Sequence, residues 1–425
     1  MKLYERRAQC VLCGSTELAE VVPLEPMPIA TPNFHVSANS SDAAFREGVP
    51  LGIHQCCACG HLQVIYFGNP ELQYRDYVYT TSISLGLPEH FRTYAAEIVA
   101  QLNLPADGLV VELGSNDGTL LRAFAERGMR VLGVDPARRI AEAATAAGIP
   151  TVPEFFTAAL CERLAGEHGR AALLVANNVV ANVEPMGDLA DGVAALLAAD
   201  GVFVFETQYG ADVIEHNLLD TVYHEHISYF LLTPLVAFFA AHGLELFDVV
   251  RVPTKGGSFR AFVQRAGAAR PLTARLRELL DREAREGMFA QPFYDRLTRE
   301  LAEIRAELRA LVDATRARGQ GVAGYGVSVG TTTLLPQFGL ERDIDFLVDD
   351  APGKAPELAG PGYTIPVVGR EELARRQPGI TIVFAWRYID PIAANNAAYL
   401  KAGGVFVVPL PRVTLRRDPA AVTVS

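Results

Sequence analysis

Short hydrophobic segments of strand length alternate with helical segments along most of this 425-residue chain. In the first series, strands are expected at residues 108–113, 130–134, 172–176 and 201–207, followed by a hairpin of 244–250 and 259–264. A second, smaller series follows a long helical region, with strands expected at 321–326, 344–348, 380–386 and 404–408. Strands that alternate with helices in this way predict an α/β protein with doubly wound sheets.

Four of the six cysteines form two CxxC pairs, each followed by glycine: Cys10, Cys13, Cys56 and Cys59. Paired CxxC turns direct four thiolates to one point, as in tetrahedral zinc sites. The proline-rich gap between the pairs is expected to be an inserted loop. A closed Cys₄ site has no open position for substrate, so this zinc is expected to be structural. A redox CxxC or unrelated buried thiols are the alternatives; Cys57 stays unassigned, and Cys161 is expected in the core.

The charge balance argues against several classes of function. The chain has 38 basic and 49 acidic residues, a formal net charge of -11. Wrapping nucleic acid or coating an anionic membrane normally needs a basic field, so neither partner is expected. The first residues lead into no apolar core of a signal peptide, and the apolar stretch at 230–244 is shorter than the ~20 residues of a membrane span. The expected location is the cytoplasm.

A glycine-rich turn follows the first strand, with the sequence Glu112-Leu-Gly114-Ser-Asn116-Asp117-Gly118. The next strand ends at Asp135, where a carboxylate can accept hydrogen bonds from both hydroxyls of an adenosine ribose. The turn is not GxGxxG, and its carboxylates would repel the pyrophosphate of a dinucleotide. They suit S-adenosylmethionine (SAM), a cationic cofactor with an amino-acid tail. NAD(P) binding and an ordinary strand–turn–helix crossover are the alternatives.

The segment Tyr223-His224-Glu225-His226 is the densest cluster of titratable residues in the chain. It follows a strand expected to end at residue 207, which places it at the carboxyl edge of the sheet. The residues expected to bind the cofactor lie at the same edge: Glu112, Gly114, Asn116, Asp117, Asp135, Asn177 and Asn178. An imidazole with a pKa near about 6.5 can remove a proton at neutral pH, and a neighbouring carboxylate can orient it. The spacing does not fit an HExxH zinc site; an HxH metal pair and structural histidines are the alternatives.

Together these motifs resemble those of one family. The CxxC pairs, ELGSNDGTLL at 112–121, Asn177-Asn178-Val, TVYHEHISYF at 221–230, GGSFR at 256–260 and the GYG turn at 324–326 occur in this order in the sugar C-methyltransferases of antibiotic biosynthesis. These are C-3′-methyltransferases that act on dTDP-linked keto-deoxysugars. The resemblance implies a zinc-binding domain at 1–70, a class I SAM-methyltransferase domain at 71–270, a helical linker at 271–318 and a smaller Rossmann-like domain at 319–425. The nucleotide sugar would bind between the last two domains.

In this family, a base removes the proton α to the sugar keto group, and the enolate attacks the methyl group of SAM. The resemblance makes His226 the base, with Glu225, Tyr223 and Tyr77 as further catalytic residues and His224 as the next candidate. The residues expected to contact the substrate are Tyr79, Asn182, Lys255 and Tyr325. The expected partner is a nucleotide sugar, and the protein is expected to be a monomer or a weak oligomer.

Two positions in the substrate pocket depart from the family pattern. Asn182 stands where relatives have histidine, and an amide cannot shuttle a proton near pH 7. Lys255 stands where histidine is more usual, and the run 329–335 lacks the lysine of an AKGNTLL-like segment. The cofactor pocket is therefore expected to be intact and the substrate pocket altered. An epimerase or isomerase that enolises without methylating, and a non-catalytic SAM-binding interaction module, are the alternative functions.

Overall fold

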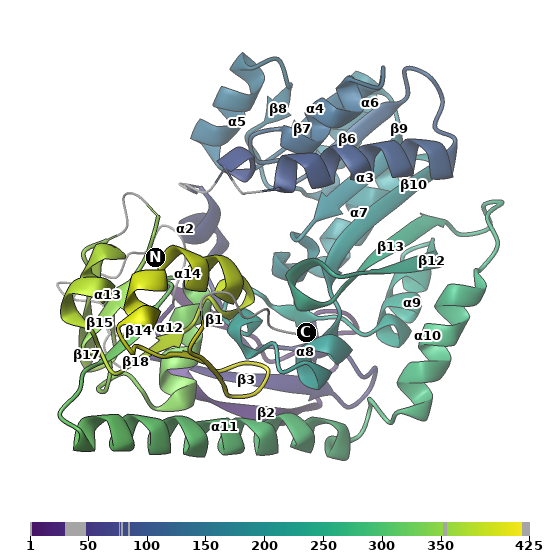
Figure 1. Ribbon diagram of the computed structural model, residues 1–425. Coiled ribbons are helices and arrows are strands. Elements are labelled where there is room, and N and C mark those ends of the chain that lie inside the picture. Colours follow the sequence, from purple (N-terminus) through teal and green to yellow (C-terminus); the bar gives the residue numbers. More distant parts are fainter. Residues whose placement is uncertain are drawn as a thin grey trace.

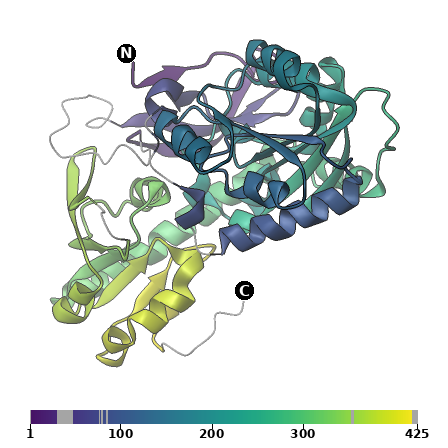
Figure 2. The same cartoon turned by 90° about the horizontal axis from the view of Figure 1, so that it is seen from above.

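The computed structural model describes residues 2–29, 48–75, 77, 80–83, 86–351 and 355–418. A central and a C-terminal α/β unit lie side by side in both views (Figure 1, Figure 2). An N-terminal sheet lies at the base of the molecule, and buried side chains of all three parts form one hydrophobic cluster (Figure 1). Within the described ranges, no helix is both long enough and apolar enough to serve as a membrane span.

The central sheet confirms the expected doubly wound α/β fold. Its described strands run in the order β12-β13-β10-β9-β6-β7-β8. Strands β10, β9, β6, β7 and β8 are parallel, and β12 and β13 form the antiparallel hairpin expected at the end of the series. The order changes direction between β6 and β9, which creates a crevice at the carboxyl ends of these strands. The bounds are β6 Leu109–Leu113, β7 Arg130–Val134, β8 Thr151–Val152, β9 Ala171–Asn177, β10 Leu197–Gln208, β12 Leu244–Val252 and β13 Ser258–Arg265.

Strand β6 shows why the sheet is hydrophobic on both faces. Val110 belongs to one buried cluster with residues of α3 (Leu87–Leu102) and α4 (Thr119–Ala125). Val111, which points to the opposite face, belongs to another cluster with residues of α6 (Ala158–His168) and α7 (Met186–Leu196). Parallel strands covered by helices on both faces are continuously apolar, as this one is up to Glu112. The other helices of this unit are α5 Arg138–Ala146, α8 Gly210–Glu215 and α9 Leu232–Ala241.

None of the strands of the N-terminal sheet was predicted from the sequence, and one of them comes from the middle of the chain. The order of the sheet is β11-β4-β3-β2, and β11 (Ser228–Tyr229) comes directly after the Tyr223–His226 segment. Next to this strand pair, the backbone N–H of Val64 donates to the carbonyl of Ile227 at 2.9 Å. The N-terminal part is thus joined to the middle of the chain by sheet hydrogen bonds. The remaining bounds are β1 Tyr4–Arg6, β2 Leu18–Met27, β3 Val49–Cys56, β4 Leu62–Gln63, β5 Tyr66–Gly68, α2 Pro70–Tyr74 and the 3₁₀ helix η1 Thr81–Ile83.

The C-terminal unit repeats the doubly wound arrangement on a smaller scale. Its sheet has the order β16-β17-β15-β14-β18-β19-β20, with β17, β15, β14, β18 and β19 parallel. The strand expected at 380–386 ends at Val383, because residues 386–388 turn into the 3₁₀ helix η5 (Trp386–Tyr388). The strand bounds are β14 Val322–Tyr325, β15 Phe346–Val348, β16 Glu357–Gly360, β17 Tyr363–Val368, β18 Ile380–Val383, β19 Phe406–Val408 and β20 Thr414–Arg416. The helices are α12 Val329–Phe338, α13 Glu371–Arg376, α14 Ile389–Asn395 and α15 Ala397–Lys401.

Two helices, α10 (Ala274–Arg285) and α11 (Gln291–Ala317), connect the two α/β units. One face of α11 is buried against β2, α8 and α12, and the helix runs beneath the N-terminal sheet (Figure 1). Most of the charges expected on a solvated face are exposed, but Glu283 of α10 is fully buried. Its carboxylate accepts hydrogen bonds from Tyr209 Oη and from the backbone amides of Leu232 and Thr233. A charged residue of the connecting helix thus caps the N-terminus of α9.

Candidate functional site

A cavity of about 500 Å³ opens at the carboxyl ends of β6 and β9, where the strand order changes direction. It is the position where open α/β sheets bind their ligands. The predicted site residues that line it are Gly114, Asn116, Asp135, Asn178, Asn182, Glu225 and Tyr77. One space therefore contains residues from the cofactor, substrate and catalytic sets.

The turn after β6 brings the backbone close to the cavity. Gly114 has a φ of +64°, in the left-handed region that favours glycine. A Cβ at this position would lie 2.5 Å from Cγ2 of Val179, which also lines the cavity. Any side chain at Gly114 would therefore displace the wall of the cavity.

Asp135 is the acidic residue of the predicted cofactor set that lines the cavity. Its Oδ2 accepts the backbone N–H of Asn116 at 2.8 Å, and its Oδ1 accepts that of Ala137 at 2.9 Å. Burial raises the pKa of this carboxyl, although the two backbone hydrogen bonds oppose the shift. Because each carboxylate oxygen can accept more than one hydrogen bond, Asp135 still offers acceptors to a ribose.

Three residues of the predicted cofactor set lie outside the cavity lining. Glu112 is buried at the end of β6, and its Oε2 has no hydrogen-bond partner among the described residues. Burial, reinforced by the charge of Asp135, raises its pKa well above the usual value. Asp117 accepts the hydroxyl of Thr119 at 2.6 Å and the amide of Ser82 at 2.9 Å, so it holds the start of α4 and the η1 segment. Asn177 ends β9, and its side-chain nitrogen and oxygen are buried without a partner in the described chain.

The Tyr223–His226 segment fixes the tautomer of His226. Nδ1 of His226 lies 2.8 Å from the backbone carbonyl of Thr221, which can only accept, so Nδ1 carries the proton. Nε2 is then the acceptor, and the Tyr223 hydroxyl donates to it at 2.9 Å. Burial and the charge of Lys255 together lower the pKa of His226 to about 3, although the hydrogen bond to Thr221 opposes the shift. The ring is therefore neutral at physiological pH.

Glu225 is the member of this segment that lines the cavity. Burial raises its pKa to about 7, while the charge of Lys255 and the Tyr74 hydroxyl oppose the shift. The Nδ2 atom of Asn182 donates to Oε1 of Glu225 at 3.5 Å. A carboxyl group with a pKa near 7 can take or give a proton at neutral pH.

Lys255 lies in the 3₁₀ turn η4 (Thr254–Gly256) between β12 and β13, with a φ of +54°. The residue is exposed to solvent, but desolvation of its ammonium group by the surrounding protein lowers its pKa. The negative charges of Glu225 and Glu206 oppose this effect. The lysine is thus an electrostatic neighbour of Glu225 and His226, although it is not part of the cavity lining.

The other predicted residues are placed as follows. His224 faces the N-terminal sheet, where its Nε2 lies 3.1 Å from the carbonyl of Pro50, and burial lowers its pKa to about 4. Tyr325 is buried in the core of the C-terminal unit and donates to Oδ2 of Asp350 at 2.8 Å. Tyr77 lines the cavity, with its ring centroid 6.1 Å from that of Tyr74. Tyr79 lies outside the described residues.

Two groups of aromatic residues that line the cavity were not predicted from the sequence. Tyr74 lines the cavity from the end of α2, and its buried hydroxyl has no hydrogen-bond partner by geometry among the described residues. It belongs to the tyrosine-rich stretch that supplied Tyr77, but the uneven spacing did not single it out. Phe155 and Phe156 follow the short strand β8 and also line the cavity. Their position directly after a strand at the carboxyl edge was the signal that could have identified them.

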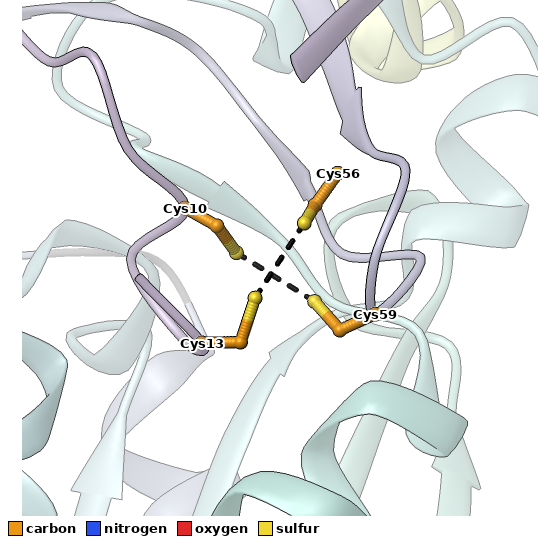
Figure 3. A group of neighbouring side chains, drawn as sticks. All are labelled: Cys10, Cys13, Cys56 and Cys59. Atoms are coloured by element: carbon orange, nitrogen blue, oxygen red, sulfur yellow. Dashed lines mark hydrogen bonds between the residues drawn. The ribbon is translucent and has the colours of Figure 1, made fainter. Parts of the chain in front are cut away.

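The four cysteines of the CxxC pairs converge on one point (Figure 3). The sulfurs of Cys10 and Cys59 are 3.6 Å apart, and those of Cys13 and Cys56 are 3.5 Å apart. Four thiolates about 2.3 Å from a tetrahedral zinc would be separated by ~3.8 Å, so the group fits a zinc ion. Cys161 is buried in the core, as expected, and Cys57 is exposed outside the group.

Comparisons with known proteins cover both α/β units. A family model described as "Methyltransferase domain" matches residues 88–249, and one described as "C-methyltransferase C-terminal domain" matches residues 253–411. The C-methyltransferase NovU of Streptomyces niveus is 33% identical over 404 residues, which cover 95% of each chain.

Solved structures match a smaller part of the chain. The protein PH0226 from Pyrococcus horikoshii OT3 is 12% identical and has a TM-score of 0.37, covering 44% of this chain and 94% of its own. The CcbJ methyltransferase from Streptomyces caelestis is 17% identical and has a TM-score of 0.33, covering 42% of this chain and 90% of its own.

Proposed function

Since the chain belongs to the sugar C-methyltransferase family, we propose that it transfers the methyl group of SAM to the carbon α to the keto group of a nucleotide-linked keto-deoxysugar. SAM-dependent C-methylation follows from the family itself. One observation supports the finer assignment: a single cavity is lined by Gly114 and Asp135 and also by Glu225 and Asn182. A cofactor and a carbon acid that share this cavity would be adjacent, which an in-line transfer requires.

The residues at the crevice fit SAM. Gly114 lets the backbone approach the ligand, and Asp135 offers acceptors to the ribose. When bound, SAM supplies an electrophilic methyl group on a sulfonium centre. The protein then has to orient the acceptor carbon and remove its proton.

We assign proton removal to the Tyr223–His226 pair. The phenolic oxygen of Tyr223 takes the α-proton while its own proton moves to Nε2 of His226, along the 2.9 Å hydrogen bond between them. The Thr221 carbonyl keeps Nε2 as the basic nitrogen throughout. Burial and the charge of the Glu225 carboxylate raise the pKa of Tyr223, which makes its oxygen a stronger base, and the Lys255 ammonium stabilises the developing enolate.

Unpartnered polar groups in the cavity support a hydroxylated substrate. The Tyr74 hydroxyl and Oδ1 of Asn182 are buried and have no hydrogen bond of ordinary distance and angle in the described part of the chain, although the hydroxyl is near enough to Glu225 to lower its pKa. Buried polar groups are normally satisfied, so both are suited to bind the hydroxyls of a sugar. By resemblance, Tyr77 and Tyr79 would complete the contacts to the nucleotide sugar, whereas the buried Tyr325 is paired with Asp350 and is not proposed as a contact; no nucleic acid or membrane partner is proposed.

We further propose that Cys10, Cys13, Cys56 and Cys59 bind one structural zinc ion. The hydrogen bond between Cys10 and Cys59 lowers the pKa of Cys10 and raises the pKa of Cys59, because the two sulfurs share one proton. A thiolate is the form that binds the metal. Free thiolates of this kind persist in a reducing compartment, which supports a cytoplasmic location.

The function is tested by mass spectrometry of dTDP-keto-deoxysugars incubated with the protein and SAM in deuterated water. Gain of one methyl group on a sugar supports the proposed reaction and identifies the substrate. Uptake of deuterium without a methyl group would instead support an enolising epimerase or isomerase. No change on any sugar, together with binding of SAM, would overturn the proposed substrate class. His226→Asn serves as the control that keeps both binding sites but removes the base.

A further inference from the structure

The C-terminal sheet has its own change of strand direction, between β14 and β18. A ligand of an open α/β sheet is expected in the crevice at the carboxyl ends of such strands. In this unit, the GYG turn and the start of α12 follow β14, and η5 follows β18. These elements border the place where a nucleotide would bind if this unit followed the general rule.

The chain's own Asp220, which belongs to the 3₁₀ turn η3 (Leu219–Thr221), lies between these elements. A Cβ at Gly330 in the first turn of α12 would lie 2.8 Å from the backbone oxygen of Asp220. From the other side, Arg387 of η5 forms a two-pronged ion pair with the Asp220 carboxylate. Its Nη1 contacts Oδ2, and its Nη2 lies 3.2 Å from Oδ1.

The backbone amides of the glycine turn are used within the C-terminal unit. Val327 donates its N–H to Oδ2 of Asp349 at 2.7 Å. Ser328 and Thr331 form a capping box, in which each side-chain oxygen accepts the other residue's amide. These amides point at side chains of the turn and not at an open phosphate site. These three amides are therefore not available to a nucleotide phosphate.

Asp220 lies directly before the segment that orients His226. Thr221 supplies the carbonyl that accepts the proton on Nδ1 of His226, at 2.8 Å. The next carbonyl, of Val222, accepts the hydroxyl of Thr333 in α12 at 3.1 Å. Residues 220–222 are thus held by three contacts from the C-terminal unit and form the support of the imidazole ring.

We propose that the C-terminal α/β unit positions the base, with Asp220, Arg387 and Thr333 as positioning residues that act through the Thr221 carbonyl on His226. The unit uses its ligand crevice to hold residues 220–222 in the conformation that keeps Nε2 of His226 toward Tyr223. This inference rests on the proposed function for its kinetic consequences. The tautomer of His226, however, can be measured without any substrate.

The experiment compares Arg387→Ala with Arg387→Lys and with the control Arg316→Ala in the full chain. Arg316 also pairs with an aspartate through two nitrogens, at 2.7 and 3.0 Å from Asp345, but this pair lies away from residues 220–222. Two readouts are used: the ¹⁵N chemical shifts of His226 without substrate, and the steady-state kinetics of deuterium exchange on the keto-sugar.

In Arg387→Ala, we expect the ¹⁵N shifts to move from the pure Nδ1–H tautomer towards a mixture of the two. Exchange should fall roughly ten- to a hundredfold in kcat, with the KM for the sugar nearly unchanged, because a misplaced base affects the reaction more than binding. Arg387→Lys should restore part of the loss, and Arg316→Ala should resemble the wild type in both readouts.

The proposal is overturned if Arg387→Ala keeps the wild-type tautomer, or if its exchange rate falls no more than that of Arg316→Ala. It is also overturned if the change in ¹⁵N shifts across the variants simply follows the decrease in their melting temperature, since that would indicate general destabilisation. Absence of exchange in the wild-type protein would count against the proposed function alone, because the ¹⁵N readout still decides the role of Arg387.

Discussion

The hydroxyl of Tyr223 donates to Nε2 of His226 across 2.9 Å, while Nδ1 of the same ring is held by the carbonyl of Thr221. The imidazole is therefore bonded at both nitrogens before any substrate binds. Such an arrangement costs little reorganisation during proton transfer, because the acceptor nitrogen and its donor are already aligned.

The first prediction follows from this alignment. Tyr223→Phe removes the hydroxyl that we propose relays the proton, and His226→Asn removes the proposed acceptor. Deuterium exchange at the α-carbon should fall at least about a hundredfold in each variant, which is the usual contribution of general-base catalysis. Binding of SAM, measured by calorimetry, should stay within about threefold of the wild type. Retained exchange in His226→Asn would place the base elsewhere, with His224 and Glu225 as the residues to test next.

The second prediction concerns pH. The pKa of Glu225 is raised to about 7, so the carboxylate form is lost as pH falls below this value. Exchange should rise with pH and level off above neutrality, and Glu225→Gln should lack this step. Lys255→Met should move the step to higher pH, because the lysine charge lowers the pKa of Glu225. Lys255→Arg, which keeps a positive charge, is the matched control; a step at the same pH in the methionine variant would contradict the assignment to Glu225.

The third prediction tests the cofactor site. Asp135→Ala removes a carboxylate that lines the cavity and holds the turn through the amide of Asn116. The Kd for SAM should increase roughly ten- to a hundredfold, the range expected for hydrogen bonds to a charged group. Binding of the sugar nucleotide should change little. An equal loss for both ligands would show that the variant disturbs the whole cavity.

The fourth prediction concerns the metal. Removal of zinc by a chelator, or Cys10→Ala, should unfold the N-terminal sheet, since metal binding contributes directly to folding. Because β4 of that sheet pairs with β11, the same treatment should also lower the exchange rate. Metal content, melting temperature and exchange are measured together. Cys57→Ser is the control, because this thiol is exposed and lies outside the group of four. An unchanged melting temperature after complete loss of metal would rule out a structural role.

The fifth prediction concerns a buried charge outside the site. Glu283→Ala leaves the Tyr209 hydroxyl and two amides at the start of α9 without their acceptor. The free energy of unfolding should decrease by about 3 kcal/mol, as for other buried charged networks that lose one partner. Glu278 lies on the same helix but is exposed, so Glu278→Ala should change stability by less than about 0.5 kcal/mol. Equal effects of the two substitutions would contradict the proposed cap.

The alternation of strands and helices was predictable because most strands of the central sheet carry their own signal, a short apolar run between turn residues; the two-residue strand β8 has none and was not predicted. Strand β11 has no such signal, since it has only two residues and exists because β4 lies beside it. The same limitation applies to η5, where the apolar run at 380–386 continues past the point at which the chain turns. Pairing with a distant segment decides these elements, and a local pattern does not record it.

For the candidate site, the sequence allowed us to predict which turns contribute residues to the cavity. The turn after β6 contains acids at 112 and 117, and the sequence cannot show in which direction each side chain points. Glu112 is buried at the end of β6 and Asp117 is hydrogen bonded to Thr119, whereas Asp135 from the next strand lines the cavity. The direction of a side chain at a turn depends on backbone dihedral angles, such as the positive φ of Asn116, that only the folded chain reveals.

The pairing of β11 with β4 bears on how such proteins can be cut and recombined. A fragment that starts after residue 70 would leave β11 without a neighbouring strand, next to the segment that carries His226. Swapping the N-terminal domain between relatives would therefore replace the strand that pairs with β11, next to His226, and not an independent domain. In a chimera joined at residue 70, β4 of one parent must still pair with β11 of the other. A junction in an ordinary interdomain linker would not impose this requirement.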